Sequence, residues 1–307
     1  MLEYQPFQLV FLLFYAVLLA FDCYKTLFPL KKVALMKPGK SLFNADAKKW
    51  NYNNKFDPKK IETVFLSFLN LLQDDKIQIF WMDETQTDIA DAIFTYDASL
   101  MTPEGGVLMS LGKNLRKGEQ EIHRQFYLEN NIPIIGEING NATAEAGDTL
   151  WLDNKTLVIG KGFRTNEDGA YQIKRIMDKI GIQVYIFDLP VYQGKNACLH
   201  LMSLISILDD KKALVYSSLL PVGLYKLLLK NNFSLIEAPK KEFQLSNTLS
   251  TNILATSPGN CIMIDSLPQT RSALEKAGIK IRVFKGDELC IACEGGPTCL
   301  TRPLLRS

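Results

Sequence analysis

The sequence predicts an α/β fold built from a repeated unit of strand, strand, helix and strand. From Lys31 onward, short apolar runs alternate with amphipathic stretches. This pattern recurs with a period of roughly fifty residues, which is typical of repeat architectures such as a closed radial array. Because no linker rich in Ser, Gly and Pro interrupts the pattern, we expect one domain over residues 31–307 and an apolar N-terminal extension over residues 1–30.

Helices are predicted where apolar residues recur at helical spacing and turn-forming residues follow. The predicted helices lie at 61–72, 118–130, 170–180, 221–229 and 270–277. Strands are predicted where short apolar runs alternate with polar residues or end at turn signals. The predicted strands lie at 32–36, 77–81, 92–95, 106–111, 134–135, 149–152, 156–160, 184–189, 199–208, 213–216, 233–238, 253–255, 261–264 and 280–284.

Turn residues mark the ends of several of these elements. The dipeptide Pro38-Gly39 closes the first strand, and the segment 130–133 (Asn-Asn-Ile-Pro) ends the second helix. Gly181 follows the third helix as its C-terminal signal. The boundaries therefore follow from local chemistry as well as from hydrophobic periodicity.

The composition is that of an ordinary globular protein. The chain has 307 residues, of which 47% are hydrophobic and 22% are charged. Its net charge of +2, without a long basic run, argues against a nucleic-acid partner. Six cysteines are few for this length and indicate reduced thiols in a cytoplasmic protein rather than a disulfide scaffold. The sequence leaves the oligomeric state open.

An apolar segment, Phe7–Phe21, lies near the N-terminus. Its length of about fifteen residues falls short of the roughly twenty that a membrane-spanning helix needs. Glu3, with no Lys or Arg before the segment, argues against a secretory signal peptide. Lys25, Lys31 and Lys32 follow, so insertion would leave the rest of the chain in the cytoplasm. Two interpretations stay open, a membrane anchor and a helix packed on the domain or on a partner.

A loop near the C-terminus places Cys299 shortly after the turn Gly295-Gly296-Pro297. The two glycines allow backbone conformations that are closed to other residues, and Pro297 fixes φ. Such a loop can hold a small side chain at the mouth of a cleft. Because the thiolate is the nucleophilic form of cysteine, Cys299 is a candidate nucleophile.

Two further segments combine carboxylates with turn-forming residues. Alternation along a strand would place Asp91 and Asp97 on one face, where they would either hold a cation or be solvated. Glu145 and Asp148 precede the predicted strand at 149–152. This second pair either caps a loop, which is the more common case, or orients an imidazole or binds a cation.

The chain has only two histidines, so any imidazole chemistry depends on His123 or His200. His123 lies in a charged helix and is expected at the surface. His200 lies in an apolar run, where a histidine is more often a hydrogen-bonded core residue than a catalyst. The C-x-x-C pair at 290–293 lacks the two further ligands of a zinc site, and the G-x-G at 160–162 lacks the third glycine of the dinucleotide fingerprint. We therefore expect neither a metal nor a cofactor.

In their order along the chain, these segments resemble the guanidino-group-modifying superfamily. It includes dimethylarginine dimethylaminohydrolases, arginine and agmatine deiminases, and arginine:glycine amidinotransferases. The matching motifs are Phe94-Thr-Tyr-Asp97, Arg116-Lys-Gly-Glu119, Glu145-Ala-Gly-Asp148, Gly162-Phe-Arg-Thr-Asn166, His200-Leu201 and Gly295-Gly-Pro-Thr-Cys299. Each motif alone is weak, but six in the family order are specific. The resemblance implies a five-bladed α/β propeller of ββαβ repeats, the pentein fold, with residues 31–307 as the catalytic domain.

The resemblance also implies hydrolysis of a guanidino substrate without a cofactor. Cys299 would attack the central carbon to give a covalent thiouronium intermediate. His200 would protonate the leaving amine and then activate water, with Glu145 orienting the imidazole. The carboxylates would bind the guanidinium and the arginines an α-carboxylate. The implied substrate-binding residues are Asp97, Asp91, Asp148, Arg116 and Arg164.

Details of the motifs favour Nω,Nω-dimethylarginine as the substrate, with citrulline and dimethylamine as products. Arginine deiminases typically have an Asp where this chain has Met202, and they carry a helical insertion for which it has no room. Amidinotransferases tend to have Asp in place of Glu145. Tyr96 argues against this substrate, because some dimethylarginine hydrolases have an acidic residue at that position. An arginine- or agmatine-type deiminase, an amidinotransferase and a non-catalytic binder of arginine derivatives stay as alternatives.

Overall fold

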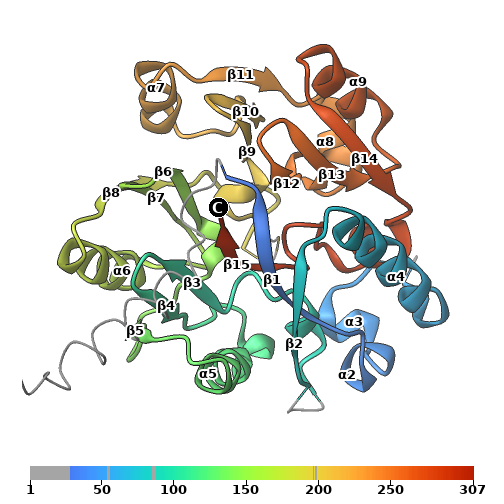
Figure 1. Cartoon of the computed structure of the whole chain (residues 1–307), viewed down its shortest axis with the longest axis horizontal. Coiled ribbons are helices and arrows are strands. Elements are labelled where there is room, and N and C mark those ends of the chain that lie inside the picture. The colour runs from blue at the N-terminus through green and yellow to red at the C-terminus, as the bar shows by residue number, and fades with distance from the viewer. Residues whose placement is uncertain (1–27, 54–55, 85–87, 196, 198) are drawn as a thin grey trace, which may run out of the picture.

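The structure is a computed structural model, and it describes residues 28–53, 56–84, 88–195, 197 and 199–307. These residues form five three-stranded sheets around a central axis, with the longer helices on the outside (Figure 1). Each sheet is one blade of an α/β propeller. The predicted fold class and its five blades are thereby confirmed.

The strands of the blades recur in the same order. They are β15 (Arg302–Arg306), β1 (Leu30–Met36) and β2 (Gln78–Met82) in the first blade, β3 (Ser99–Thr102), β4 (Gly105–Leu108) and β5 (Ile134–Glu137) in the second, β6 (Thr149–Asp153), β7 (Thr156–Lys161) and β8 (Gln183–Asp188) in the third, β9 (Ile205–Asp209), β10 (Lys212–Val215) and β11 (Ser234–Glu237) in the fourth, and β12 (Leu254–Ser257), β13 (Asn260–Ile264) and β14 (Lys280–Phe284) in the fifth. The first strand named in each blade lies nearest the axis and is its inner strand (Figure 1).

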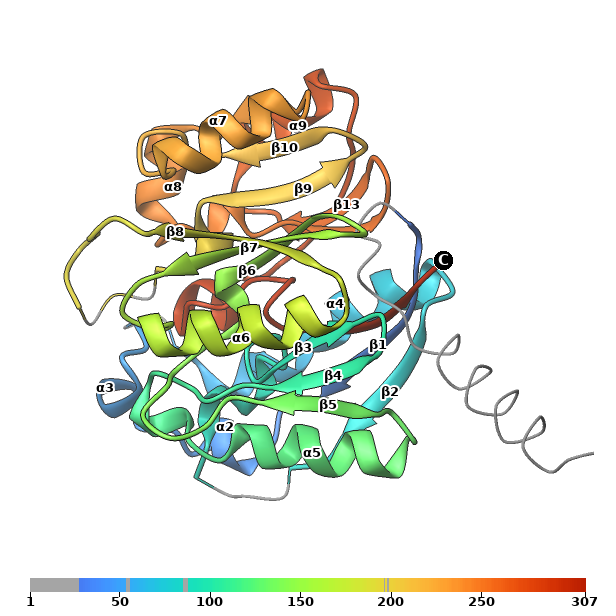
Figure 2. The same cartoon turned by 90° about the vertical axis from the view of Figure 1, so that its left-hand side faces the viewer.

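Within each blade, the inner strand is antiparallel to the middle strand, and the outer strand is parallel to the middle strand. A parallel neighbour requires a crossover connection, which is a helix here. The crossover helices are α4 (Pro58–Asp74), α5 (Glu119–Glu129), α6 (Glu167–Lys179), α7 (Val222–Lys230) and α9 (Pro268–Lys276). Figure 2 shows α5, α6 and α7 on the outer surface of successive blades. Shorter helices are α2 (Lys40–Phe43), α3 (Ala47–Trp50) and α8 (Lys240–Leu245).

Helix α4 shows how the sequence builds these crossovers. Its buried side chains follow helical spacing and form one apolar face, at Ile61, Val64, Phe65, Phe68, Leu69 and Leu72. The carboxylate of Asp57 accepts a hydrogen bond from the backbone N–H of Lys59 at 3.0 Å, and Pro58 occupies the first turn. Both features stabilise a helix N-terminus, so the start of α4 is encoded locally.

The first blade joins the two ends of the described chain. Strand β15 pairs antiparallel with β1, with Val33 opposite Pro303. The buried guanidinium of Arg306 fastens this seam by donating to the carbonyl oxygens of Phe28 at 3.1 Å and Ala255 at 2.8 Å. Strand β15, which the sequence did not predict, therefore closes the propeller and fixes the loop that precedes it.

A ring of hydrogen bonds joins the loops that lead into the inner strands, and we call it the axial ring. Each of its five bonds connects successive blades. They run from Ala146 N–H to the Asp97 carbonyl (2.9 Å), Leu201 N–H to Asp148 Oδ1 (3.0 Å), Thr251 Oγ1 to the Ser203 carbonyl (2.6 Å), Thr298 N–H to Asn252 Oδ1 (3.0 Å) and Tyr96 N–H to the Cys299 carbonyl (3.2 Å). Since an unpaired buried polar group costs about 1–3 kcal/mol, the ring strongly constrains these loops.

Three local predictions were wrong. The expected strand at 92–95 overlaps a 3-10 turn, Ala90–Ile93, because a buried run of only three apolar residues, at 92–94, carries no strand-specific period. The run at 199–208 divides into a 3-10 turn, Leu201–Ser203, and strand β9. His123 is buried rather than at the surface, and its Nδ1 lies 2.8 Å from the hydroxyl oxygen of Ser99. Strand β3 and the short helices were not predicted.

The apolar segment Phe7–Phe21 lies outside the described residues, so membrane association through it stays a prediction. None of the helices that the structure describes has both the length and the apolar character that crossing a membrane requires.

We expect Thr251→Val to lower the free energy of unfolding by about 1–3 kcal/mol, because it removes the hydroxyl donor that the Ser203 carbonyl of the axial ring shares with the Thr248 carbonyl. Urea denaturation followed by circular dichroism measures this change. Thr63→Val, on the exposed face of α4, is the matched control and should change the free energy by less than about 0.5 kcal/mol. Equal free energies of unfolding for the two variants would show that this bond of the axial ring does not stabilise the fold.

Candidate active site

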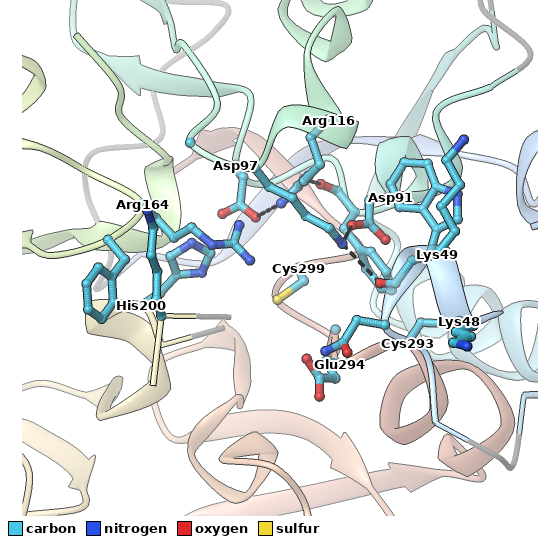
Figure 3. Close-up of a pocket in the computed structure, with 18 residues that line it drawn as sticks. Lys48, Lys49, Asp91, Asp97, Arg116, Arg164, His200, Cys293, Glu294 and Cys299 are labelled. Atoms are coloured by element: carbon cyan, nitrogen blue, oxygen red, sulfur yellow. Dashed lines mark hydrogen bonds and ion pairs between the residues drawn. The ribbon is translucent and has the colours of Figure 1, made fainter. Parts of the chain in front are cut away.

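The loops of the axial ring surround the inner end of a cavity of about 400 Å³. The side chains of Cys299, His200 and Asp97 meet at this end (Figure 3). Arg164 lies beside His200, and Asp91, Lys48 and Lys49 lie on the opposite side of Cys299 (Figure 3). Lys113, Arg116 and the exposed Lys195 also line the cavity. The structure thus brings six of the eight predicted site residues to one cavity.

The three predicted catalytic residues occupy equivalent places in three blades. Glu145 precedes β6, His200 precedes β9 and Cys299 precedes β15. Each of these strands is an inner strand that is buried and paired with the middle strand of its blade. A side chain just before such a strand is held close to the axis, so the repeat itself brings the three together.

His200 and Glu145 form a buried pair. Nε2 of His200 lies 2.6 Å from Oε2 of Glu145, which is fully buried. Burial alone would raise the pKa of Glu145, but Arg164, with Nη1 2.8 Å from Oε2, and His200 lower this pKa well below its usual range. An ionised carboxylate in this position orients the imidazole and stabilises its charged form.

Gly147 allows the histidine and an acid to approach each other. A Cβ at this position would lie 2.6 Å from Nδ1 of His200 and 2.8 Å from Oδ1 of Asp97. The backbone N–H of Gly147 also donates to Oδ1 of Asp97 at 2.9 Å. The glycine of the Glu-Ala-Gly-Asp motif is therefore needed for close packing at the site.

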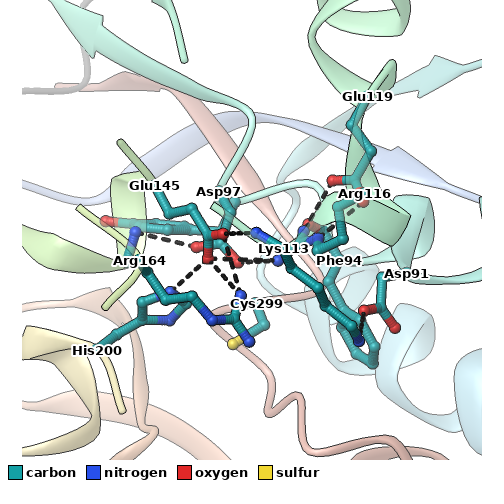
Figure 4. Close-up of polar contacts among 12 residues, drawn as sticks. Asp91, Phe94, Asp97, Lys113, Arg116, Glu119, Glu145, Arg164, His200 and Cys299 are labelled. Atoms are coloured by element: carbon teal, nitrogen blue, oxygen red, sulfur yellow. Dashed lines mark hydrogen bonds and ion pairs between the residues drawn. The ribbon is translucent and has the colours of Figure 1, made fainter. Parts of the chain in front are cut away.

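Arg116 is buried between two carboxylates (Figure 4). Its Nε and Nη2 contact both oxygens of Glu119 at 2.7 and 2.8 Å, and its Nη1 lies 2.6 Å from Oδ2 of Asp97. Burial would raise the pKa of Asp97, but the charges of His200 and Arg116 lower it, while burial raises the pKa of Glu119 to about 7. This geometry favours a role for Arg116 in positioning Asp97 over the predicted contact with an α-carboxylate.

A second ion pair lies farther along the cavity. Nζ of Lys113 is 2.6 Å from Oδ2 of Asp91, and the hydroxyl of Tyr52 donates to Oδ1 at 2.8 Å. The same ammonium lies 3.3 Å from the carbonyl oxygen of Trp50 and 5.0 Å from its ring centroid. Sequence reasoning placed Asp91 with the guanidinium and missed Lys113.

The amide of Asn252 clamps the nucleophile. Its Nδ2 donates to Sγ of Cys299 at 3.1 Å, and its Oδ1 accepts the backbone N–H of Thr298 at 3.0 Å. Burial and Asp97 raise the pKa of the thiol to about 11, although the Asn252 hydrogen bond and His200 oppose the shift. The resting cysteine is thus a neutral thiol at pH 7. Sequence reasoning missed Asn252, although it precedes β12, the inner strand of the fifth blade.

The nucleophile loop uses its glycines differently from the expectation. The left-handed residue is Glu294, with φ 59°, and neither Gly295 nor Gly296 has a positive φ. A Cβ at Gly295 would lie 2.2 Å from the ring of Phe94, and one at Gly296 would lie 2.5 Å from the amide of Asn252. Both glycines are therefore required by close packing rather than by their own backbone conformation.

A smaller cavity of about 30 Å³ borders the same reactive groups. It shares Asp97, His200 and Cys299 with the larger cavity, and Met202 is part of its lining. This volume fits one or two water molecules or a small alkyl group. Asp148, in contrast, is fully buried outside the lining of both cavities. Its contact with Leu201 N–H positions the backbone beside His200 instead of binding a substrate.

Asp97, Glu145 and His200 are also spaced so that they could hold a metal ion, since one ligand atom of each lies within 4.8 Å of the others. Arg116 and Arg164 already pair with the two carboxylates, however. A divalent cation there would face two guanidinium groups at short range, and like charges repel. The donor set therefore suits proton transfer and an organic cation better than a metal.

The fold and the site together define a guanidino-group-modifying enzyme. Residues 36–289 match the family model described as N,N dimethylarginine dimethylhydrolase, eukaryotic. The chain belongs to this family of hydrolases, which act on the C–N bonds of linear amidines. The nucleophile loop with Cys299 lies just beyond the matched residues.

Individual proteins show the same relationship. The chain is 24% identical to the uncharacterized protein YkgA of Bacillus subtilis, with 90% of this chain and 92% of that one covered. It is 23% identical to the N(G),N(G)-dimethylarginine dimethylaminohydrolase of Pseudomonas aeruginosa, with coverages of 88% and 98%. The solved amidinotransferase SxtG of Microseira wollei shares the fold, with a TM-score of 0.76 at 15% identity and coverages of 93% and 97%.

The raised pKa of Cys299 predicts a steep pH dependence of alkylation by iodoacetamide in the free protein. Because only the thiolate reacts and the pKa is about 11, the rate at Cys299 should rise about tenfold per pH unit between about pH 7 and pH 10. Peptide mass spectrometry measures this rate, and the Cys299→Ser variant supplies the background. A rate that levels off below about pH 8 would contradict the neutral resting thiol.

We predict that Asn252→Asp slows the alkylation of Cys299 and lowers kcat/KM, each by roughly tenfold or more, because a hydrogen bond to a charged group contributes about 1.5–3 kcal/mol. Asp keeps an acceptor for Thr298 N–H but loses the donor to sulfur. The matched control is Asn260→Asp on β13, which is not part of the cavity lining. Alkylation of Asn252→Asp at the wild-type rate would leave Asn252 with a purely structural role.

Proposed function

We propose that the protein hydrolyses a dimethylguanidino group, converting Nω,Nω-dimethylarginine and water into citrulline and dimethylamine. The observation that carries this proposal is the meeting of Cys299, Asp97 and the His200–Glu145 pair at one end of a single cavity. A nucleophile, a carboxylate for the cation and an oriented acid–base group are the parts that the reaction needs.

The first half-reaction forms a bond to sulfur. The planar guanidinium lies against Asp97, which is anionic and buried, and this cation favours the thiolate of Cys299. The Cys299 thiol passes its proton to His200, the resulting thiolate attacks the central carbon, and the C–N bond to the dimethylated nitrogen breaks. His200 supplies the proton that leaves with dimethylamine, and the carbon remains on Cys299 as a thiouronium.

The second half-reaction returns the enzyme to its starting state. His200, now neutral, takes a proton from a water molecule that adds to the thiouronium carbon. The C–S bond breaks as the added hydroxyl becomes the carbonyl of the ureido product, and the electron pair returns to sulfur. His200 gives its proton back to the Cys299 thiolate, the hydroxyl proton is released to solvent, and the product leaves. Glu145 supports both steps because its negative charge stabilises the imidazolium that forms between them.

The small cavity beside Cys299 favours a substrate whose leaving group is dimethylamine. It borders Cys299 and His200, and Met202 in its lining offers an apolar surface to an N-methyl group. An arginine deiminase with an acid at this position would pair it with an unsubstituted nitrogen. The Met side chain cannot make that charged contact, which favours a substituted guanidino group over free arginine.

The test incubates the purified protein with Nω,Nω-dimethylarginine, arginine and agmatine in separate reactions. We expect dimethylamine and citrulline from the first, and an acid-quenched thiouronium adduct on the peptide that contains Cys299. Cys299→Ser should lower the rate by at least about a thousandfold, whereas Cys261→Ser, at a buried cysteine on β13, should keep it.

Other outcomes would point to a different function. Ammonia released from arginine, with little dimethylamine from the methylated substrate, would identify a deiminase. Transfer of the amidino group to an added amine would identify an amidinotransferase. Binding without turnover, unchanged in Cys299→Ser, would identify a non-catalytic binder of arginine derivatives.

A further inference from the structure

We propose that the outer part of the cavity selects guanidino carboxylates that lack an α-ammonium group, so that deaminated Nω,Nω-dimethylarginine (dimethylguanidinopentanoate) is preferred over Nω,Nω-dimethylarginine itself. This inference rests on the proposed hydrolysis and concerns only the tail of the substrate. An arginine derivative carries both an α-ammonium and an α-carboxylate, and each needs a partner of opposite charge when it is desolvated.

Asp91 is the carboxylate best placed to bind a substrate ammonium, but it already binds the ammonium of Lys113. Asp91 is 6% exposed, and its Oδ2 lies 2.6 Å from Nζ of Lys113 while its Oδ1 accepts the hydroxyl of Tyr52 at 2.8 Å. Lys113 is held there by the carbonyl and the ring of Trp50 as well. Since the Lys113 ammonium neutralises Asp91, a second ammonium would meet a cation beside the acid.

The other carboxylates at or behind the reactive end of the cavity are also engaged. Asp97 pairs with Arg116, and the proposed reaction uses it for the guanidinium. Glu145 is paired with Arg164 and His200. These two acids therefore have no negative charge to offer the tail.

Glu294 is the remaining acid in the described lining of the cavity. Its Oε1 accepts Nδ2 of Asn247 at 3.3 Å, and it also borders the small cavity beside Cys299. Burial raises the pKa of Glu294, while the charges of Lys113 and Arg164 oppose the shift. Figure 3 shows its carboxylate on the side of Cys299 away from Asp91. Because the charges of Lys113 and Arg164 already act on this carboxylate, an ammonium that approaches Glu294 also meets protein cations.

Cations dominate the outer part of the cavity. Lys48 and Lys49, on α3, lie on the side of Asp91 (Figure 3), and Lys113 is paired with Asp91. Lys195, from the loop after β8, also lines the cavity. Lys48, Lys49 and Lys195 form no ion pair within the described part of the chain. A substrate carboxylate entering this region gains attraction from several lysines, whereas an ammonium is repelled.

The experiment compares three probes that share the dimethylguanidino group. They are Nω,Nω-dimethylarginine, its deaminated counterpart dimethylguanidinopentanoate, and dimethylagmatine, which lacks the carboxylate. Release of dimethylamine gives kcat/KM for each. We expect the deaminated compound to exceed dimethylarginine by roughly tenfold or more, and dimethylagmatine to be the poorest, because like charges juxtaposed in a buried site are strongly disfavoured.

Lys113→Met tests the residue responsible. Methionine keeps an unbranched apolar stem against Trp50 but removes the charge, which leaves Asp91 able to accept a substrate ammonium. The ratio of kcat/KM for the deaminated compound to that for dimethylarginine should fall by roughly tenfold or more and should reverse in favour of dimethylarginine. Lys155→Met, at an exposed turn remote from the cavity, should keep the wild-type ratio. The melting temperature and the alkylation rate of Cys299 report whether Lys113→Met is folded.

The outcomes separate this inference from the proposed function. A wild-type protein that prefers dimethylarginine, or a Lys113→Met variant that is folded but keeps the wild-type ratio, would overturn the inference and leave the hydrolysis standing. If the wild type hydrolyses none of the probes, calorimetric binding to Cys299→Ser decides. Tighter binding of the deaminated compound would then support the inference while the proposed hydrolysis fails, and tighter binding of dimethylarginine would overturn both.

Discussion

The axial ring is the constraint on which the rest of the structure depends. Each of its bonds ties the loop before one inner strand to the loop before the next, and the bond from Tyr96 to Cys299 completes the circle. That last bond is possible only because β15 returns from the C-terminal end to pair with β1. A propeller closed in this way has no free rotation between blades, so the residues in these loops keep fixed distances from the axis. The chemistry is assembled by closure of the fold and not by any single segment.

Charge pairing follows from the burial that this closure creates. Isolated charges are costly away from water, so the buried acids at the axis are held by partners: Glu119 and Asp97 by Arg116, and Glu145 by Arg164 and His200. The same burial makes Cys299 a poor acid in the free protein. Binding of a guanidinium changes this balance, because the cation offsets Asp97 and favours the thiolate beside it. The nucleophile is therefore activated mainly when the substrate is in place.

The sequence predicted the reactive end of the site better than its tail. The period of the strands and helices indicated the blades. Cys299, His200, Glu145 and Asp97 each belong to a short motif that can be recognised in the sequence alone. Strand β15 could not be foreseen as the partner of β1, since pairing between the two ends of a chain leaves no local pattern. The amide of Asn252 was missed because its contact with sulfur joins the loops before two successive inner strands, and no motif in the sequence marks Asn252.

The position of Lys113 could not be predicted from the family motifs and is known only from the structure. It follows Gly112, whose N–H contacts Glu145, and yet its own side chain turns to Asp91 in the preceding segment. The motifs surrounding it are those of the family, so they indicate what happens at the guanidino carbon. They do not indicate the tail, which depends on charges contributed by α3 and by loops outside the motifs. One ion pair can thus redirect specificity while the catalytic groups stay unchanged, because discrimination between substrates needs an unfavourable contact as much as a favourable one.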